Sequence, residues 1–364
     1  NPSSMVDFNG TLFFAAADSG ANGTELWKSD GTDAGTVLVS NINTAANTSS
    51  IPANLTVVGS TLYFTANGSA ASGLELWKTD GTGAGTMLVK DINPGAATSS
   101  PFLLRAVNGR LVLAATTPTE GTELWASDGT NAGTVLVTDL TPGAASTTFT
   151  NLFVHGSGSF MFFTPTSATY GTELWRTDGT TAGTMLVKDI NPGTNSSSVA
   201  NASITPNGLV FSASNGINGS ELWISDGTDA GTYMLLEINP GSASSTPSNF
   251  RMVGSQLFFT AFSPAAGVEL WRSDFTPGGT YMVQDSIPGT GSFSASSLVQ
   301  LGSAAVFQGF DPLNGSELWI TDGTAAGTRI VADLTLGSQG SGATPFTIHN
   351  GRLYLGAADV AGGN

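Results

Sequence analysis

The chain has no cysteine and only two histidines and eleven basic residues among its 364 residues. Without cysteine it cannot build a disulfide framework, a thiolate metal site or a cysteine nucleophile. The 27 acidic residues leave a formal charge of −16, which argues against binding to nucleic acid or to an anionic membrane surface. Apolar runs such as residues 12–17 are much shorter than the roughly 18 residues of a membrane span. The composition therefore predicts neither a nucleic-acid partner nor membrane insertion.

Turn-forming residues are abundant, with 47 glycines and 16 prolines in a background rich in serine, threonine and asparagine. This composition is typical of many short strands joined by turns, and it nearly excludes helix. Hydrophobic residues make up 40% of the chain and charged residues only 10%, so the chain can bury a large core and is not a disordered acidic tail. We expect an all-β fold.

An internal repeat runs through the whole chain and is marked by its seven tryptophans. Each tryptophan ends a Glu-Leu-Trp triplet, and successive tryptophans lie 48 or 50 residues apart. An aspartate follows three residues after each tryptophan. In six of the seven copies Gly-Thr comes next, and in the remaining copy, the sixth along the chain, Phe275-Thr276 stands there instead. The tryptophans are Trp27, Trp77, Trp125, Trp175, Trp223, Trp271 and Trp319. Such a period indicates a repeat architecture.

This pattern resembles the ELWxxDGT repeat family, which is found in large secreted bacterial proteins. The resemblance covers essentially the whole chain and departs from the family pattern at residues 275–277 and at Asn41, where later repeats carry Asp or Glu. It implies an extracellular or cell-surface protein built as a repeat array, with no enzymatic activity attached to the motif.

Each repeat is expected to contain four short strands, which in the second copy span residues 55–58, 62–66, 74–79 and 86–92. The second strand carries apolar residues on both faces, so both faces of its sheet must be covered, and no helix is available to cover them. Stacked four-stranded sheets of this length predict a β-propeller with seven blades. Eight blades, or part of a longer array, remain the alternative, and a β-solenoid is less favoured because it lacks the paired hairpin turns.

The C-terminal residues 345–364 repeat the first two strands once more. We therefore predict one domain over residues 1–364, made of seven repeats of about 48 residues and a C-terminal half-repeat. The half-repeat either closes a seven-bladed ring by overlap with the N-terminus or belongs to a longer array.

Twenty of the 27 carboxylates occupy three repeated positions: the Glu of Glu-Leu-Trp, the hairpin Asp, and the end of the fourth strand. The hairpin Asp is expected to accept backbone N–H groups of its own turn. The Glu is expected to bond a neighbouring strand or turn, because a buried unpaired carboxylate is costly. Calcium is the weaker alternative, with no other cofactor expected. Its candidate ligands are Asp30, Asp33, Asp226 and Asp229.

The loops from strand two to three and from strand four to the next repeat vary most, and they share one rim of the predicted propeller. Function usually resides on variable loops held by a rigid scaffold. The candidate binding residues on this rim are Asp18, Asn22, Glu120, Tyr170, Asp311 and Asn314. Their polar chemistry suits a broad contact better than a deep pocket. We therefore predict a non-enzymatic structural or adhesive module that associates with proteins or with itself into extracellular filaments or matrix. A glycan-binding propeller is the alternative.

Overall fold

The computed structural model describes residues 2–18, 22–45, 48–68 and 72–358, and in these ranges the chain is all-β with no helix. In these ranges no helix is long and apolar enough to cross a membrane. The chain divides into two compact units, one formed by residues 1–169 and 174–186 and the other by residues 170–173 and 187–364.

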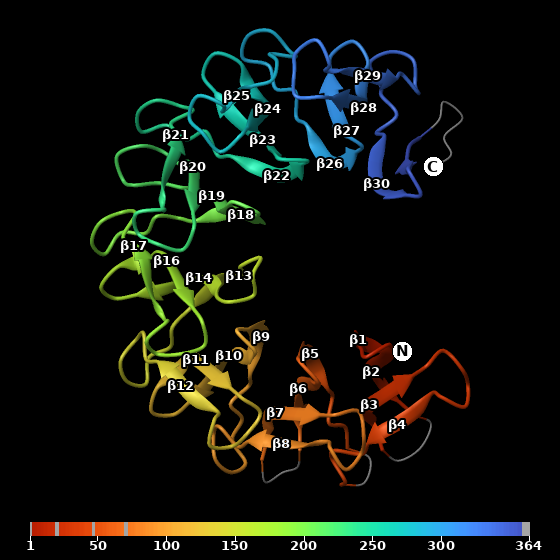
Figure 1. The fold of residues 1–364 in the computed structure, drawn as a ribbon, viewed down its shortest axis with the longest axis vertical. Coiled ribbons are helices and arrows are strands. Elements are labelled where there is room, and N and C mark those ends of the chain that lie inside the picture. The colour runs from red at the N-terminus through yellow and green to blue at the C-terminus, as the bar shows by residue number, and fades with distance from the viewer. Residues whose placement is uncertain (1, 19–21, 46–47, 69–71, 359–364) are drawn as a thin grey trace. The chain divides into compact units, whose positions relative to one another are not determined.

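The first unit opens with three four-stranded antiparallel sheets, in each of which the strands follow sequence order (Figure 1). The first sheet contains β1 (Ser3–Phe8), β2 (Thr11–Ala17), β3 (Thr24–Ser29) and β4 (Val37–Ser40). The second contains β5 (Ala53–Val58), β6 (Thr61–Asn67), β7 (Leu74–Thr79) and β8 (Met87–Lys90). The third contains β9 (Phe102–Val107), β10 (Arg110–Thr117), β11 (Gly121–Ser127) and β12 (Val135–Thr138).

The fourth sheet contains the division between the units. Its main path is β13 (Phe149–Val154), β14 (Met161–Ser167), β16 (Leu174–Thr177) and β17 (Met185–Lys188). The short β15 (Gly171–Thr172) pairs with β14 beside this path.

The second unit continues with three more sheets of the same order. The fifth sheet contains β18 (Ala200–Thr205), β19 (Gly208–Ala213), β20 (Glu221–Ser225) and β21 (Tyr233–Leu236). The sixth contains β22 (Ser248–Val253), β23 (Gln256–Ser263), β24 (Gly267–Ser273) and β25 (Tyr281–Met282). The seventh contains β26 (Ser296–Leu301), β27 (Ala304–Asp311), β28 (Gly315–Thr321) and β29 (Arg329–Ala332). The prediction of an all-β propeller architecture built from four-stranded blades is confirmed.

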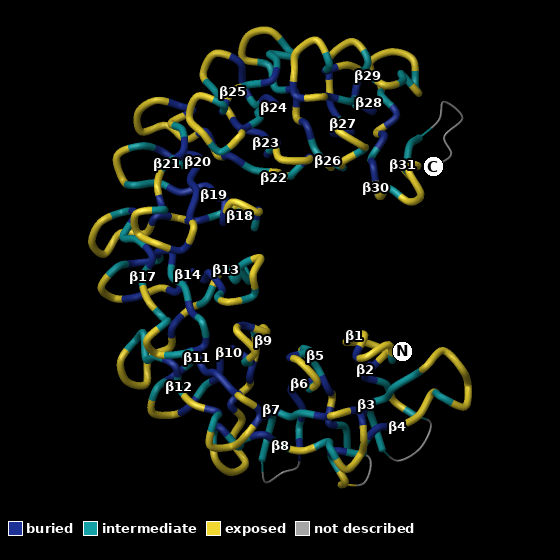
Figure 2. Tube along the Cα trace, in the orientation of Figure 1, coloured by how far each residue is buried: buried dark blue, intermediate teal, exposed yellow. Residues whose placement is uncertain are grey.

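Within each unit, neighbouring blades pack face to face because their second strands are apolar on both sides. In β6, Leu62 and Phe64 join a core cluster with β2 and β3 of the first blade, whereas Tyr63 joins a cluster with Leu113 and Trp125 of the third blade. Successive side chains of a strand point to opposite faces, so one strand contributes to two cores. Figure 2 shows the second strands of the seven four-stranded blades as largely buried segments.

The turn between the first two strands is a tight hairpin, as the Asn-Gly pairs predicted. Asn9 and Gly10 have φ values of 55° and 78°, which is the left-handed pair of a type I′ turn. The first strand also carries a bulge that the sequence pattern did not reveal. In β5 the register with β6 shifts between Ala53 and Thr56, and Asn54 has a φ of 56°. Such bulges bend a strand and increase its twist.

The half-repeat forms a two-stranded sheet of β30 (Thr344–His349) and β31 (Arg352–Gly356). Strand β30 lies against β26 and β27 of the seventh blade. The predicted copy of strands one and two is therefore present, although residues 359–364 lie outside the described residues. Ring closure by the half-repeat and the single-domain organisation of residues 1–364 stay predictions.

We expect Phe64→Ala to lower the free energy of unfolding by about 3–5 kcal/mol, because the ring fills the space between two blades and its loss leaves a cavity. Its side chain is 0% exposed, whereas Phe102 of β9 is 38% exposed. Urea unfolding followed by tryptophan fluorescence measures both variants. Phe102→Ala is the control and should cost less than about 1 kcal/mol; equal losses would refute the two-sided core.

Candidate functional site

The glutamate of each Glu-Leu-Trp triplet is fully buried and hydrogen-bonded to the connection that leads into the next blade. The carboxylate of Glu25 accepts the N–H of Ile42 at 2.9 Å, the N–H of Ser50 at 2.9 Å and the hydroxyl of Ser50 at 2.5 Å. The seven buried glutamates are Glu25, Glu75, Glu123, Glu173, Glu221, Glu269 and Glu317. The predicted bond to a neighbouring turn is confirmed, so these carboxylates belong to the scaffold.

The sixth repeat departs from this arrangement. In the other six, a serine or threonine 24 or 25 residues after the glutamate donates its hydroxyl to the carboxylate. Phe293 stands at this place in the sixth repeat, 24 residues after Glu269, and packs edge-on against Trp319 with ring centroids 4.7 Å apart. Glu269 accepts the N–H of Ser286 at 3.1 Å, but its Oε1 is buried without a partner. Burial, and secondarily the nearby charge of Asp285, raises the pKa of Glu269 to about 7.

We expect the free energy of unfolding to decrease as the pH rises from about 5 to about 8. Burial raises the pKa of Glu173 and Glu269 from 4.5 to about 7, so between these values the folded chain holds protons that the unfolded chain has released. This stabilising contribution is complete below pH 4.5 and is lost as the pH passes 7. Urea midpoints across this range measure the loss, expected on the order of 1 kcal/mol or more per group.

Glu269→Gln provides the test of cause, because an amide cannot ionise. The variant should match the parent near pH 5 and exceed its stability near pH 8. Glu221→Gln is the matched control: Glu221 accepts hydrogen bonds from Ile238, Asn239 and Ser245, so this variant should lose stability at both pH values. A Glu269→Gln variant with the parent's pH profile would contradict the assignment.

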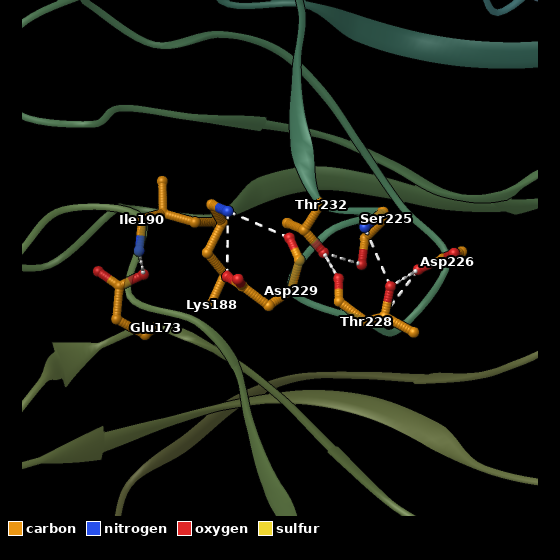
Figure 3. Close-up of polar contacts among 9 residues, drawn as sticks. Glu173, Lys188, Ile190, Ser225, Asp226, Thr228, Asp229 and Thr232 are labelled. Atoms are coloured by element: carbon orange, nitrogen blue, oxygen red, sulfur yellow. Dashed lines mark hydrogen bonds and ion pairs between the residues drawn. The ribbon is translucent and has the colours of Figure 1, made fainter.

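The hairpin aspartates bind their own turn, as Figure 3 shows for Asp226. Its Oδ1 accepts the N–H of Thr228 at 2.8 Å and the hydroxyl of Thr228 at 2.7 Å. Thr228 accepts the N–H of Gly231 in turn, and the hydroxyls of Ser225 and Thr232 share a 2.7 Å hydrogen bond. Asp30 makes the same two bonds to Thr32. The predicted role of the aspartate in its own turn is confirmed. Both donors come from the residue two positions further on: its backbone N–H and its hydroxyl.

The other two calcium candidates are placed differently. The carboxylate of Asp229 forms an ion pair with Lys188 at 3.0 Å (Figure 3), and the main-chain carbonyl of Asp33 accepts the N–H of Thr36. Within the described residues no group of three or more His, Cys, Asp or Glu side chains could hold a metal ion. The structure does not bring Asp30, Asp33, Asp226 and Asp229 together as one ligand set, and calcium binding at either turn stays a prediction.

The candidate residues of the variable loops fall into separate places. Asn22 donates to Asp18 at 2.9 Å and accepts from Asn41 at 3.0 Å. Glu120 accepts the hydroxyls of Thr117 and Thr119 within its own loop. Tyr170 is half-buried immediately before β15. The middle of two predicted loops, residues 19–21 and 69–71, lies outside the described residues.

Asp311 and Asn314 are brought together in the loop from β27 to β28. Asp311 Oδ1 accepts the N–H groups of Leu313 at 2.8 Å and Asn314 at 3.0 Å, and Asp311 Oδ2 accepts the side-chain amide of Asn314 at 2.8 Å. These three bonds fix the loop so that the Leu313 side chain projects, 80% exposed.

This loop forms one wall of a cavity of about 720 Å³ in the second unit. The segment that leaves the sixth blade and strands β28 and β29 also line it. The lining residues are Gln284, Ser286, Ile287, Pro288, Asp311, Pro312, Leu313, Asn314, Trp319, Thr328, Arg329 and Ile330. Trp319 is only 7% exposed, and its indole N–H has no hydrogen-bond acceptor. The same indole N–H lacks an acceptor in all seven repeat tryptophans, so it belongs to the scaffold, and the apolar side chains of the lining are what distinguish the cavity.

Asp311 and Asn314 could be named from the sequence, whereas Trp319, Leu313 and Arg329 were missed. The sequence assigns the tryptophans to the core, and it disfavours a deep pocket because the variable loops are mainly hydroxyl, amide and small residues with a few aromatics. One signal was present: ten residues after the tryptophan, the other repeats carry apolar or aromatic residues, and the seventh carries Arg329.

No protein-family model and no curated protein matches the chain. The structures to which it is similar include a puromycin hydrolase, at 14% identity and a TM-score of 0.38, covering 91% of this chain and 53% of that one. They also include a prolyl endopeptidase, at 14% identity and a TM-score of 0.43, covering 90% and 49%. The computationally designed Ika8 protein matches at 13% identity and a TM-score of 0.40, covering 98% and 93%. The chain spans about half the length of these two peptidases.

This comparison corrects the functional prediction made from the sequence. The natural proteins among these similar structures are peptidases, so the prediction of a non-enzymatic adhesive or filament-forming module is wrong, and so is its glycan-binding alternative. The prediction that the chain is not an enzyme is withdrawn with them. Its error had a physical source: small polar residues on loops show that a surface is solvated, and they do not identify what the surface binds.

Proposed function

We propose that the chain is a ligand-binding β-propeller module whose cavity at Trp319 takes a small molecule with an apolar body. The observation that carries this proposal is the set of apolar side chains, Ile287, Leu313 and Ile330 among them, that line the cavity beside Trp319.

The size and walls of the cavity support this proposal. Its volume of about 720 Å³ lies within the range of roughly 300–1,000 Å³ that is typical of ligand pockets. Ile287, Pro288, Leu313 and Ile330 offer apolar surface from three separate segments. A pocket that is mostly apolar, with a few convergent polar groups, is the usual form of a small-molecule site.

The lining residue Gln284 differs from its counterpart in the second repeat. That counterpart is Lys90 of the second blade, whose ammonium group lies 5.9 Å from the ring centroid of Trp125 in the third blade. Gln284 occupies the repeat position of Lys90, thirteen residues after the preceding tryptophan. Gln284 therefore lines a cavity, whereas Lys90 at the same repeat position lies over a tryptophan ring.

The location of the chain is a separate proposal. We propose that it is extracellular or at the cell surface, which is supported by the resemblance of the repeats to those of secreted bacterial proteins. Protein partners stay a prediction.

Binding of the neutral probe 2-naphthaleneacetamide tests the proposed pocket. Titrating the probe into the ¹⁵N-labelled full chain should shift the indole N–H resonance of Trp319, assigned with Trp319→Phe, in a saturable manner. Leu313→Ser should weaken binding about tenfold, because an exposed leucine that folds over a ligand contributes on the order of 1.5 kcal/mol of apolar burial.

Ile217→Ser is the matched control. Ile217 is 78% exposed and lies six residues before Trp223, as Leu313 lies before Trp319, but it does not line this cavity. Its replacement should leave the affinity unchanged. Absence of a saturable shift at Trp319, or equal effects of the two serine variants, would reject the pocket.

A further inference from the structure

We infer that Ser286 sets the size of the ligand that this cavity accepts. Serine stands there in place of an isoleucine that other repeats bury between two blades, so the cavity admits an apolar body larger than a single ring. This inference rests on the proposed function, because it names the size class of ligand and a specificity-determining residue for the same cavity.

Ser286 departs from the repeat at a position that is otherwise apolar. It lies 17 residues after Glu269, the glutamate of the sixth Glu-Leu-Trp triplet. The residues at this position in the other repeats are Ile42, Ile92, Leu140, Ile190, Ile238 and Leu334. The four isoleucines are only 3–8% exposed. The repeat therefore normally buries an apolar side chain here, and the sixth repeat carries a small hydroxyl residue instead.

The main chain makes the same contact at this position in the fifth and sixth repeats. The N–H of Ile238 donates to Glu221 at 2.7 Å, and the N–H of Ser286 donates to Glu269 at 3.1 Å. The Ile238 side chain joins a core cluster with Phe259 of the sixth blade, whereas Ser286 lines the cavity. The space that an isoleucine side chain would take at position 286 is therefore part of the cavity.

Phe293 and Gly309 show that the core between the sixth and seventh blades is repacked around this change. Phe293 replaces the usual serine or threonine, is fully buried and joins a core cluster with Trp319. A Cβ atom on Gly309 would lie 2.6 Å from the Phe293 ring and 2.8 Å from Trp319, so glycine makes room for both rings.

The position of Gly309, opposite the glutamate of its blade, is also changed from the repeat. The residues that pair with the glutamate in five other blades are Ala16, Ala66, Ala115, Ala213 and Ala261. The apolar group has thus moved from position 286 to position 293, with a glycine to receive it. This exchange keeps the core filled and leaves the space at Ser286 to a ligand.

The volume of the cavity fits a ligand of this size. A cavity of roughly 150 Å³ already binds benzene, whereas this cavity measures about 720 Å³. A single ring would therefore leave part of the apolar surface of Ile287, Leu313 and Ile330 uncovered. Because the free energy of binding grows with the apolar area that is buried, a body of two fused rings gains more here than a single ring.

Two neutral probes that differ in size test this inference. The full chain is titrated calorimetrically with 2-naphthaleneacetamide and, separately, with phenylacetamide, which carries a single ring. The larger probe should bind at least about tenfold more tightly to the parent chain. Ser286→Ile should reduce this preference at least about fivefold and leave the affinity for phenylacetamide within about twofold, because the added side chain takes space that only the larger body needs.

Ser286→Ala and Thr290→Ile are the matched controls. The first removes the hydroxyl and adds no bulk, and the second adds an isoleucine to an exposed residue of the same connection that does not line the cavity. Both should keep the parent's preference. Ser286→Val repeats the test with a smaller side chain, and thermal unfolding verifies that each variant is folded.

The outcomes separate the two proposals. Equal binding of the two probes to the parent chain, or a preference that survives both Ser286→Ile and Ser286→Val, overturns the role of Ser286 and leaves the pocket standing. Loss of the preference in Ser286→Ala or Thr290→Ile also overturns it, because neither variant fills the cavity. Failure of both probes to bind the parent chain overturns the pocket and the role of Ser286 together.

Discussion

The hydrogen bonds of the buried glutamate in each Glu-Leu-Trp triplet link the third strand of a blade to the chain that leads into the next blade. Glu25 does this with Ile42 and Ser50, and Glu317 does it with Leu334 and Ser341. A carboxylate buried without such donors would be strongly destabilising, so each connection must pass where it can donate. The repeat thereby fixes where every blade begins, and the loops between these anchors are free to differ.

The proposed site lies where the repeat departs from its own pattern. In the sixth repeat Phe293 replaces the usual hydroxyl, leaves Glu269 with an unpartnered oxygen and packs against Trp319. In the seventh repeat Leu313 and Arg329 appear at positions that the scaffold does not require. Residues that lower stability or solubility and make no stabilising contact in exchange are typical of functional sites.

Most of the fold could be predicted from the sequence. Apolar residues on both faces of a strand require a sheet on each side, Asn-Gly pairs favour tight hairpins, and a buried Glu requires hydrogen-bond donors nearby. The predicted end of a strand was wrong where a buried side chain competes with the sheet for a backbone N–H group. The fourth strand was predicted to reach Ile92 but ends at Lys90, since Ile92 donates its N–H to Glu75. The cavity was missed because its walls, residues 284–288 and 311–314, meet only in the folded chain.

The most direct test of the proposed site is a crystal structure of the chain with 2-naphthaleneacetamide. We expect the naphthyl ring in the cavity, in contact with Leu313 and Ile330. A naphthyl ring bound elsewhere on the chain, with this cavity empty, would contradict the proposed site.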